Sequence, residues 1–183
     1  MADEQDKELL KRFRDPSSRN MAFSELVNCY QERLYWHIRR IVIDHDDADD
    51  VLQNTFIKAF KNLENFRADS QLFTWLYRIA TNESLSFLKK QRKNVFVSLD
   101  AISYSLVSKL EADPELSGDA IQLKLQKAIL TLPTKQRMVF NMKYFDEMKY
   151  EEIAEVTGTS IGALKASYHH AVKKIEAFLK QQF

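Results

Sequence analysis

Apolar residues recur at three- and four-residue steps along most of this chain, which is the spacing of amphipathic helices. The first such stripe consists of Phe23, Leu26, Val27, Tyr30, Leu34 and Ile38. The polar run DHDDADD follows it, and its acids would lie in the first turn of the next helix, where they favour the positive end of the helix dipole. That helix is predicted over about 47–63, and another over about 71–91. The first half therefore predicts a helical bundle.

The second half is periodic again after a break. Its first stripe consists of Ile121, Leu125, Ala128, Ile129 and Leu132. Two further helices are predicted at about 149–156 and 160–179, whereas the segment before the first stripe has no sustained period and contains a proline and a glycine. These patterns predict an all-α protein of two small helical domains, 1–93 and 119–183, joined by a linker at 94–118.

Composition supports this fold class and narrows the chemistry. Only 3 Gly and 3 Pro occur in 183 residues, which is few for a chain rich in tight turns. The single cysteine excludes an internal disulfide and a four-cysteine zinc site, and the apolar neighbours of Cys29 predict a buried thiol. No apolar run is long enough for a bilayer, and the N-terminus lacks the hydrophobic stretch of a signal peptide. We therefore expect a cytoplasmic protein without membrane insertion.

The net charge of +1 hides two separated clusters of like charge. The acidic cluster consists of Asp44, Asp46, Asp47, Asp49 and Asp50, and the basic cluster of Lys89, Lys90, Arg92 and Lys93. Separated patches suit a protein that touches two different kinds of partner. Charge alone leaves open the alternative of two solvated helix ends.

The sharpest local pattern is YEEIAEVTGTSIGALKASYHHAVKKI. Gly158 permits a turn between two helices, and Thr159 or Ser160 can cap the second one. Once apolar positions are assigned to the inner face, the outer surface of the second helix keeps Lys165, Ser167, His169, His170, Lys173 and Lys174. This layout is typical of a DNA-binding helix-turn-helix, and a helical hairpin with an ordinary polar face is the alternative. No metal site is expected at the two histidines, because adjacent helical residues diverge by about 100°.

A second unusual stretch, NFRADSQLFTWLYRIATNESLSFLKKQRK, combines aromatic rings, arginines and an amide. Aromatic residues of this kind are often core residues. The combination also provides what binding of unpaired bases requires, since rings stack on bases while amides read base edges.

At this point the sequence resembles the sigma-70 family of RNA polymerase sigma factors. The blocks DDADDVLQNTFIKAFKNLENFR and FTWLYRIATNESLSFLKKQRK resemble sigma region 2, and LPTKQRMVFNMKYFDEMKYEEIAEVTGTSIGALKASYHHAVKKIEAFL resembles region 4. The further regions of larger sigma factors have no counterpart here, which indicates the extracytoplasmic-function (ECF) group. The resemblance implies core RNA polymerase and promoter DNA as partners, an anti-sigma factor as a regulator, and no cofactor.

The resemblance also implies roles for individual residues. Docking on the clamp coiled coil of the polymerase β′ subunit is expected of Asp49, Asp50, Gln53, Asn54, Phe56 and Lys58. Contacts to the melted −10 element are expected of Phe66, Arg67, Ser70, Phe73, Trp75, Arg78, Asn82, Lys89, Lys90 and Arg92. Contacts to the −35 element are expected of Thr159, Ser160, Lys165, Ser167, His169, His170 and Lys173, while region 4 also touches the β flap. Many family members carry several arginines on this helix, so the sequence preference at −35 is left open.

The expected function is to direct core RNA polymerase to promoters and to stabilise the melted −10 element in transcription initiation. A duplex-binding repressor or activator is the alternative from another class, although such a protein has no need of the aromatic stretch. An enzyme is not expected, because the chain contains no Walker sequence, nucleophile elbow or zinc signature.

Overall fold

The computed structural model describes residues 4–67, 70–94, 108, 110 and 119–181 of the 183-residue chain. All regular elements within these ranges are helices, which confirms the all-α prediction. Contacts divide the chain into two compact units, one consisting mainly of residues 1–87 and the other mainly of residues 88–183. The predicted linker, 94–118, lies outside the described residues except for Asn94, Ser108 and Leu110.

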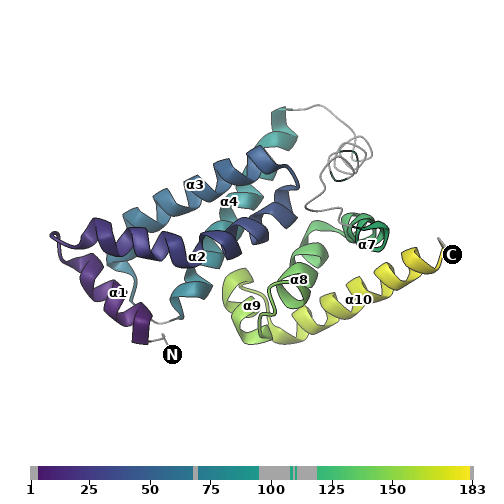
Figure 1. The fold of residues 1–183 in the computed structure, drawn as a ribbon. Coiled ribbons are helices and arrows are strands. Elements are labelled where there is room, and N and C mark those ends of the chain that lie inside the picture. The colour runs from purple at the N-terminus through teal and green to yellow at the C-terminus, as the bar shows by residue number, and fades with distance from the viewer. Residues whose placement is uncertain (1–3, 68–69, 95–107, 109, 111–118, 182–183) are drawn as a thin grey trace. The chain divides into compact units, whose positions relative to one another are not determined.

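The N-terminal unit is a bundle of four α-helices and one short 3-10 helix (Figure 1). Its elements are α1 (Glu4–Arg14), α2 (Arg19–Val42), α3 (His45–Asn62), η1 (Leu63–Asn65) and α4 (Leu72–Asn94). The predicted second and third helices match α3 and α4 to within a few residues. Asp44 caps α3 by accepting a hydrogen bond from the Asp47 amide at 3.1 Å, and Asp46 and Asp47 lie in its first turn as predicted.

The core of this unit lies between α2 and its neighbours. Phe13, Leu26, Leu34, Ile38, Leu72 and Leu76 are completely buried. The prediction of a buried Cys29 was wrong, since its side chain is exposed. Three residues advance a helix by about 300°, so Cys29 falls about 60° beyond Leu26, on the side away from the rest of the apolar stripe.

Between residues 119 and 181 the C-terminal unit contains α7 (Ala120–Leu130), α8 (Thr134–Tyr144), α9 (Tyr150–Thr157) and α10 (Ile161–Lys180). Its core forms where α10 packs on α7 and α8 and buries Ala128, Ile129, Leu132, Phe140, Ala171 and Ile175. Gly158 adopts the left-handed conformation with φ 66°, and the Ser160 hydroxyl accepts a hydrogen bond from the Ala163 amide at 3.4 Å. The predicted turn and cap of the helix-turn-helix are therefore confirmed.

Candidate nucleic-acid interface

One face of α4 carries the side chains expected to meet unpaired DNA. Trp75, Arg78, Asn82 and Lys89 are spaced by three, four and seven residues, which places them along one side of the helix. Trp75 is half-buried, and the other three are exposed. None of these three polar side chains forms a hydrogen bond or an ion pair with another residue that the structure describes. We call these four residues the α4 stripe, and its polar groups are available to a ligand.

The ring of Phe66 packs against Trp75 of the stripe. Its side chain is only 6% exposed, and its ring centroid lies 5.1 Å from that of Trp75. Its carbonyl oxygen accepts a hydrogen bond from the Arg14 guanidinium at 3.4 Å. A ring this buried orients Trp75 and leaves little surface of its own for a base.

The remaining residues expected at the −10 element fall around the stripe. Arg67 and Lys90 are exposed and Ser70 is half-buried, while Arg92 belongs to α4 but its side chain lies outside the described part. Phe73 differs from this group, because two residues turn a helix by about 200° and Phe73 thus faces away from Trp75. Its ring lies 4.4 Å from the Arg33 guanidinium and 4.3 Å from the Tyr77 ring. The structure therefore does not bring Phe73 into the α4 stripe.

Polar bonds fix α4 on α2 behind the stripe. The Tyr77 hydroxyl donates to the Arg33 carbonyl oxygen at 3.4 Å. His37 is buried, and its Nε2 lies 2.9 Å from the Thr81 hydroxyl, within hydrogen-bond distance. Because these bonds lie on the side of α4 that packs against α2, they hold the stripe in a defined orientation.

A second surface is an apolar groove between α2 and α3. Its volume is about 360 Å³, and it is lined by Phe23, Val27, Gln53, Phe56, Ile57, Phe60 and Lys61. Ile57 is 46% exposed although it is a large apolar side chain. Of the residues expected to dock on polymerase, Gln53 and Phe56 belong to this groove. The other lining residues were not among the predicted docking residues. The spacing of positions 53, 56, 57 and 60 places them on one side of a helix, so the sequence did indicate such a surface.

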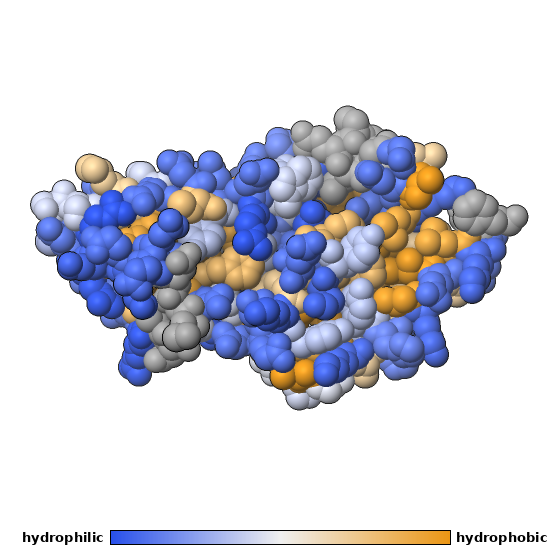
Figure 2. Space-filling model, turned by 60° about the horizontal axis from the view of Figure 1, so that its bottom comes forward, coloured by the Kyte–Doolittle hydropathy of each residue, from blue (hydrophilic) through white to orange (hydrophobic). Residues whose placement is uncertain are grey.

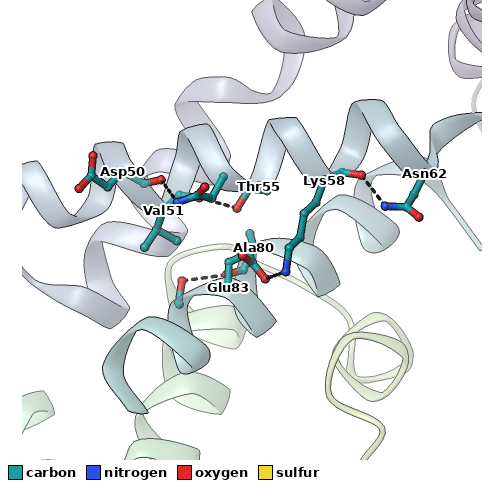
Figure 3. A network of polar contacts seen from close by, with 9 residues as sticks. Asp50, Val51, Thr55, Lys58, Asn62, Ala80 and Glu83 are labelled. Carbon is teal, nitrogen blue, oxygen red and sulfur yellow. Dashed lines mark hydrogen bonds and ion pairs between the residues drawn. The ribbon is translucent and has the colours of Figure 1, made fainter. Parts of the chain in front are cut away.

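The other expected docking residues lie outside the groove lining. Asp49 and Asp50 are exposed, and the Asp49 carboxylate lies 3.6 Å from His45 Nε2. The Asn54 amide donates to the Asp50 carbonyl oxygen at 2.9 Å. Lys58 points toward α4 and forms an ion pair with Glu83 at 2.5 Å (Figure 3).

The exposed side of α10 presents the residues expected at the −35 element. Lys165, His169, His170 and Lys173 are exposed, as are Thr159 and Ser160 at the start of the helix, and Ser167 is half-buried. The Lys165 ammonium lies 5.8 Å from the centroid of the Tyr150 ring on α9. Burial raises the pKa of the Tyr150 hydroxyl, so this ring stays neutral beside the lysine. The surface is therefore cationic, and α9 supports one of its lysines.

Comparison with known proteins decides the family. The family model for Sigma-70 region 2 matches residues 26–94, and that for Sigma-70, region 4 matches residues 122–175. The ECF RNA polymerase sigma factor SigW of Bacillus subtilis is 30% identical over 87% of this chain and 89% of its own length. The RNA polymerase sigma-H factor of Pseudomonas aeruginosa is 32% identical over 98% and 96%. The chain belongs to the sigma-70 family.

Within that family the chain groups with the ECF sigma factors, since the ECF RNA polymerase sigma-E factor of Escherichia coli is also 32% identical over 85% of both chains. The fold agrees with two solved structures, each 24% identical to this chain. CnrH in complex with the cytosolic domain of CnrY has a TM-score of 0.72 and covers 98% of this chain and 100% of its own. The sigma factor RpoE in complex with the anti-sigma factor NepR from Bartonella quintana has a TM-score of 0.70 over 86% and 96%. This sigma factor directs RNA polymerase to promoters in transcription initiation.

Proposed function

We propose that the sigma factor divides promoter opening among three surfaces: the α4 stripe holds unpaired bases of the −10 element, α10 reads the −35 element, and the α2–α3 groove docks on the β′ clamp coiled coil. The observation that carries the proposal is the α4 stripe itself. There an indole ring stands beside a guanidinium and a carboxamide that have no partner among the described residues.

Stacking on Trp75 supplies the affinity of the stripe for unpaired DNA. Unpairing and flipping a base costs a few kcal/mol, and stacking on an aromatic ring returns about 1–3 kcal/mol per base. The exposed carboxamide of Asn82 can both donate to and accept from a base edge, whereas Arg78, Lys89 and Lys90 provide cations for the phosphates. Binding energy alone then stabilises the melted strand, so the protein needs no catalytic activity and no cofactor.

The groove suits a helical partner. Its apolar lining and the exposed Ile57 match the mode in which a helix lays apolar side chains into a groove. The adjacent Asp49 and Asp50 add negative charge that complements a basic segment of a partner.

The C-terminal unit also offers an apolar surface. Figure 2 shows orange surface gathered over this unit, at the right of the view. The half-buried apolar residues of α7 and α10 that pack against the core of this unit include Leu125, Tyr168, Val172, Phe178 and Leu179. We assign contact with the polymerase β flap to this surface and −35 readout to the opposite, cationic side of α10. With a net charge of +1 the free protein binds DNA weakly, and tethering to polymerase raises the effective concentration of both modules.

The three surfaces belong to two sigma regions joined by a linker. We assign region 2 to residues 1–93, region 4 to residues 119–183 and the linker to residues 94–118. An anti-sigma factor is a fitting regulator, since the RpoE neighbour is in complex with one. The cytoplasm is the proposed location, and no helix of the described residues has both the length and the apolar character to cross a bilayer.

Substitution of Asn82 tests the proposal. In holoenzyme reconstituted with core polymerase, Asn82→Ala is expected to reduce the permanganate reactivity of unpaired thymines at the −10 element. Its affinity for core polymerase should stay the same, because the residue lies away from the groove. Asn28→Ala, an exposed asparagine on α2, serves as the matched control. Equal losses of core binding and promoter opening would contradict the assigned role.

A further inference from the structure

Lys58 belongs to the α4 surface and not to the docking groove. Adjacent residues of a helix diverge by about 100°, so Lys58 points away from the groove that its neighbour Ile57 lines. Its ammonium reaches across to α4 and lies 2.5 Å from the Glu83 carboxylate (Figure 3). The resemblance to the family implied a contact with polymerase for this residue, whereas the geometry links it to the helix that carries the stripe.

Glu83 is an unusual neighbour for a surface that meets DNA. It directly follows Asn82 in the sequence, and its side chain is only 15% exposed. Among the residues that the structure describes, Lys58 is the only cation paired with it. Since the Debye length is about 10 Å at 0.1 M salt, an unneutralised carboxylate at this position would still repel nearby phosphates.

We propose that Lys58 neutralises Glu83 and thereby keeps the α4 stripe compatible with the phosphate backbone of the melted strand. Lys58 is then a positioning residue for promoter opening, and it acts through a carboxylate of its own chain. This inference rests on the proposed role of the α4 stripe. It assigns to the pair an electrostatic effect on DNA that a merely structural ion pair would not have.

Three variants distinguish an electrostatic effect of the pair on DNA from a purely structural one: Lys58→Met, Glu83→Gln and the double variant. In reconstituted holoenzyme, Lys58→Met is expected to lower the equilibrium fraction of open complex by about three- to tenfold, the size of effect that one partly screened charge produces. Glu83→Gln removes the negative charge that would repel the phosphates, so this variant should open promoters at least as well as the wild type. The double variant should regain most of the activity lost by Lys58→Met.

Three results would overturn the proposed role of Lys58. If the pair only holds α3 against α4, Lys58→Met and Glu83→Gln will reduce opening to the same extent, which overturns the proposal. It is also overturned if Lys58→Met weakens binding to core polymerase and Glu83→Gln fails to restore it, or if Lys58→Met has no effect on opening.

Two controls complete the design. Arg12→Met breaks an ion pair of similar geometry, Arg12 with Glu25 at 2.6 Å, on α1 and α2, and it should leave opening unchanged. Thermal unfolding of each variant reports any loss of stability separately from opening. A failure of the proposed function has a different signature, because Asn82→Ala would then leave opening unaffected whatever the charge variants do.

Discussion

Ile57 provides the sharpest test of the docking groove, because its side chain is apolar, accessible and part of the lining. Complete burial of an isoleucine side chain contributes about 1.5–3 kcal/mol relative to full exposure. Ile57 is 46% exposed in the free protein, so a partner that covers it gains about half of that range, about 0.7–1.4 kcal/mol. Ile57→Ala should therefore weaken binding to core polymerase by about three- to tenfold.

The assay is the affinity of labelled sigma factor for core polymerase, measured by fluorescence anisotropy without DNA. Met21→Ala is the matched control, since Met21 is a large apolar residue of α2, 73% exposed and outside the groove lining. Both variants should unfold within about 0.5 kcal/mol of the wild type, as exposed substitutions generally do. If Ile57→Ala binds core polymerase as tightly as Met21→Ala does, the groove is not the docking surface.

Two further predictions concern −35 recognition by α10 and the stability of the N-terminal unit. Lys165→Ala combined with His170→Ala should reduce transcription mainly from promoters with a cognate −35 element, measured against the same promoters with that element scrambled. An equal loss on both templates would show that these residues do not read sequence. Burial, assisted by a hydrogen bond to Asp6, raises the pKa of Tyr30, so its neutral form stabilises the folded state below the ordinary tyrosine pKa of about 10. The free energy of unfolding should therefore fall as the pH rises above 10, and this fall should be shallower in Tyr30→Phe; identical pH profiles would refute the coupling.

The side chains of α10 also affect which promoter sequences the protein can prefer. His169 and His170 occupy exposed positions where an arginine would offer a bidentate contact to guanine. A neutral imidazole makes only single hydrogen bonds, one as donor and one as acceptor. Discrimination at −35 should then come from Lys165 and from the single hydrogen bonds of the two histidines. Phosphate contacts at the start of α10 and the tether to polymerase add affinity without sequence preference.

The sequence by itself determined the helical class, the helix-turn-helix and the family. The spacing of apolar residues located α3, α4, α9 and α10 to within a few residues, because each helix must bury one stripe. The helix-turn-helix could be predicted from Gly158 and Ser160, whose roles depend on local backbone conformation and one short hydrogen bond. The polar face of α4 could be predicted for the same reason, since residues three, four and seven positions apart share a side of any helix.

Only the tertiary structure decided which side chains of neighbouring helices meet. Phe73 and Trp75 are two residues apart, yet Phe73 packs against Arg33 while Trp75 packs against Phe66. The groove between α2 and α3 and the pairing of Lys58 with Glu83 join residues that are distant in sequence. A periodic pattern fixes the direction of a side chain relative to its own helix axis. It carries no information about the rotation and offset at which two helices pack, and these decide the partner of each side chain.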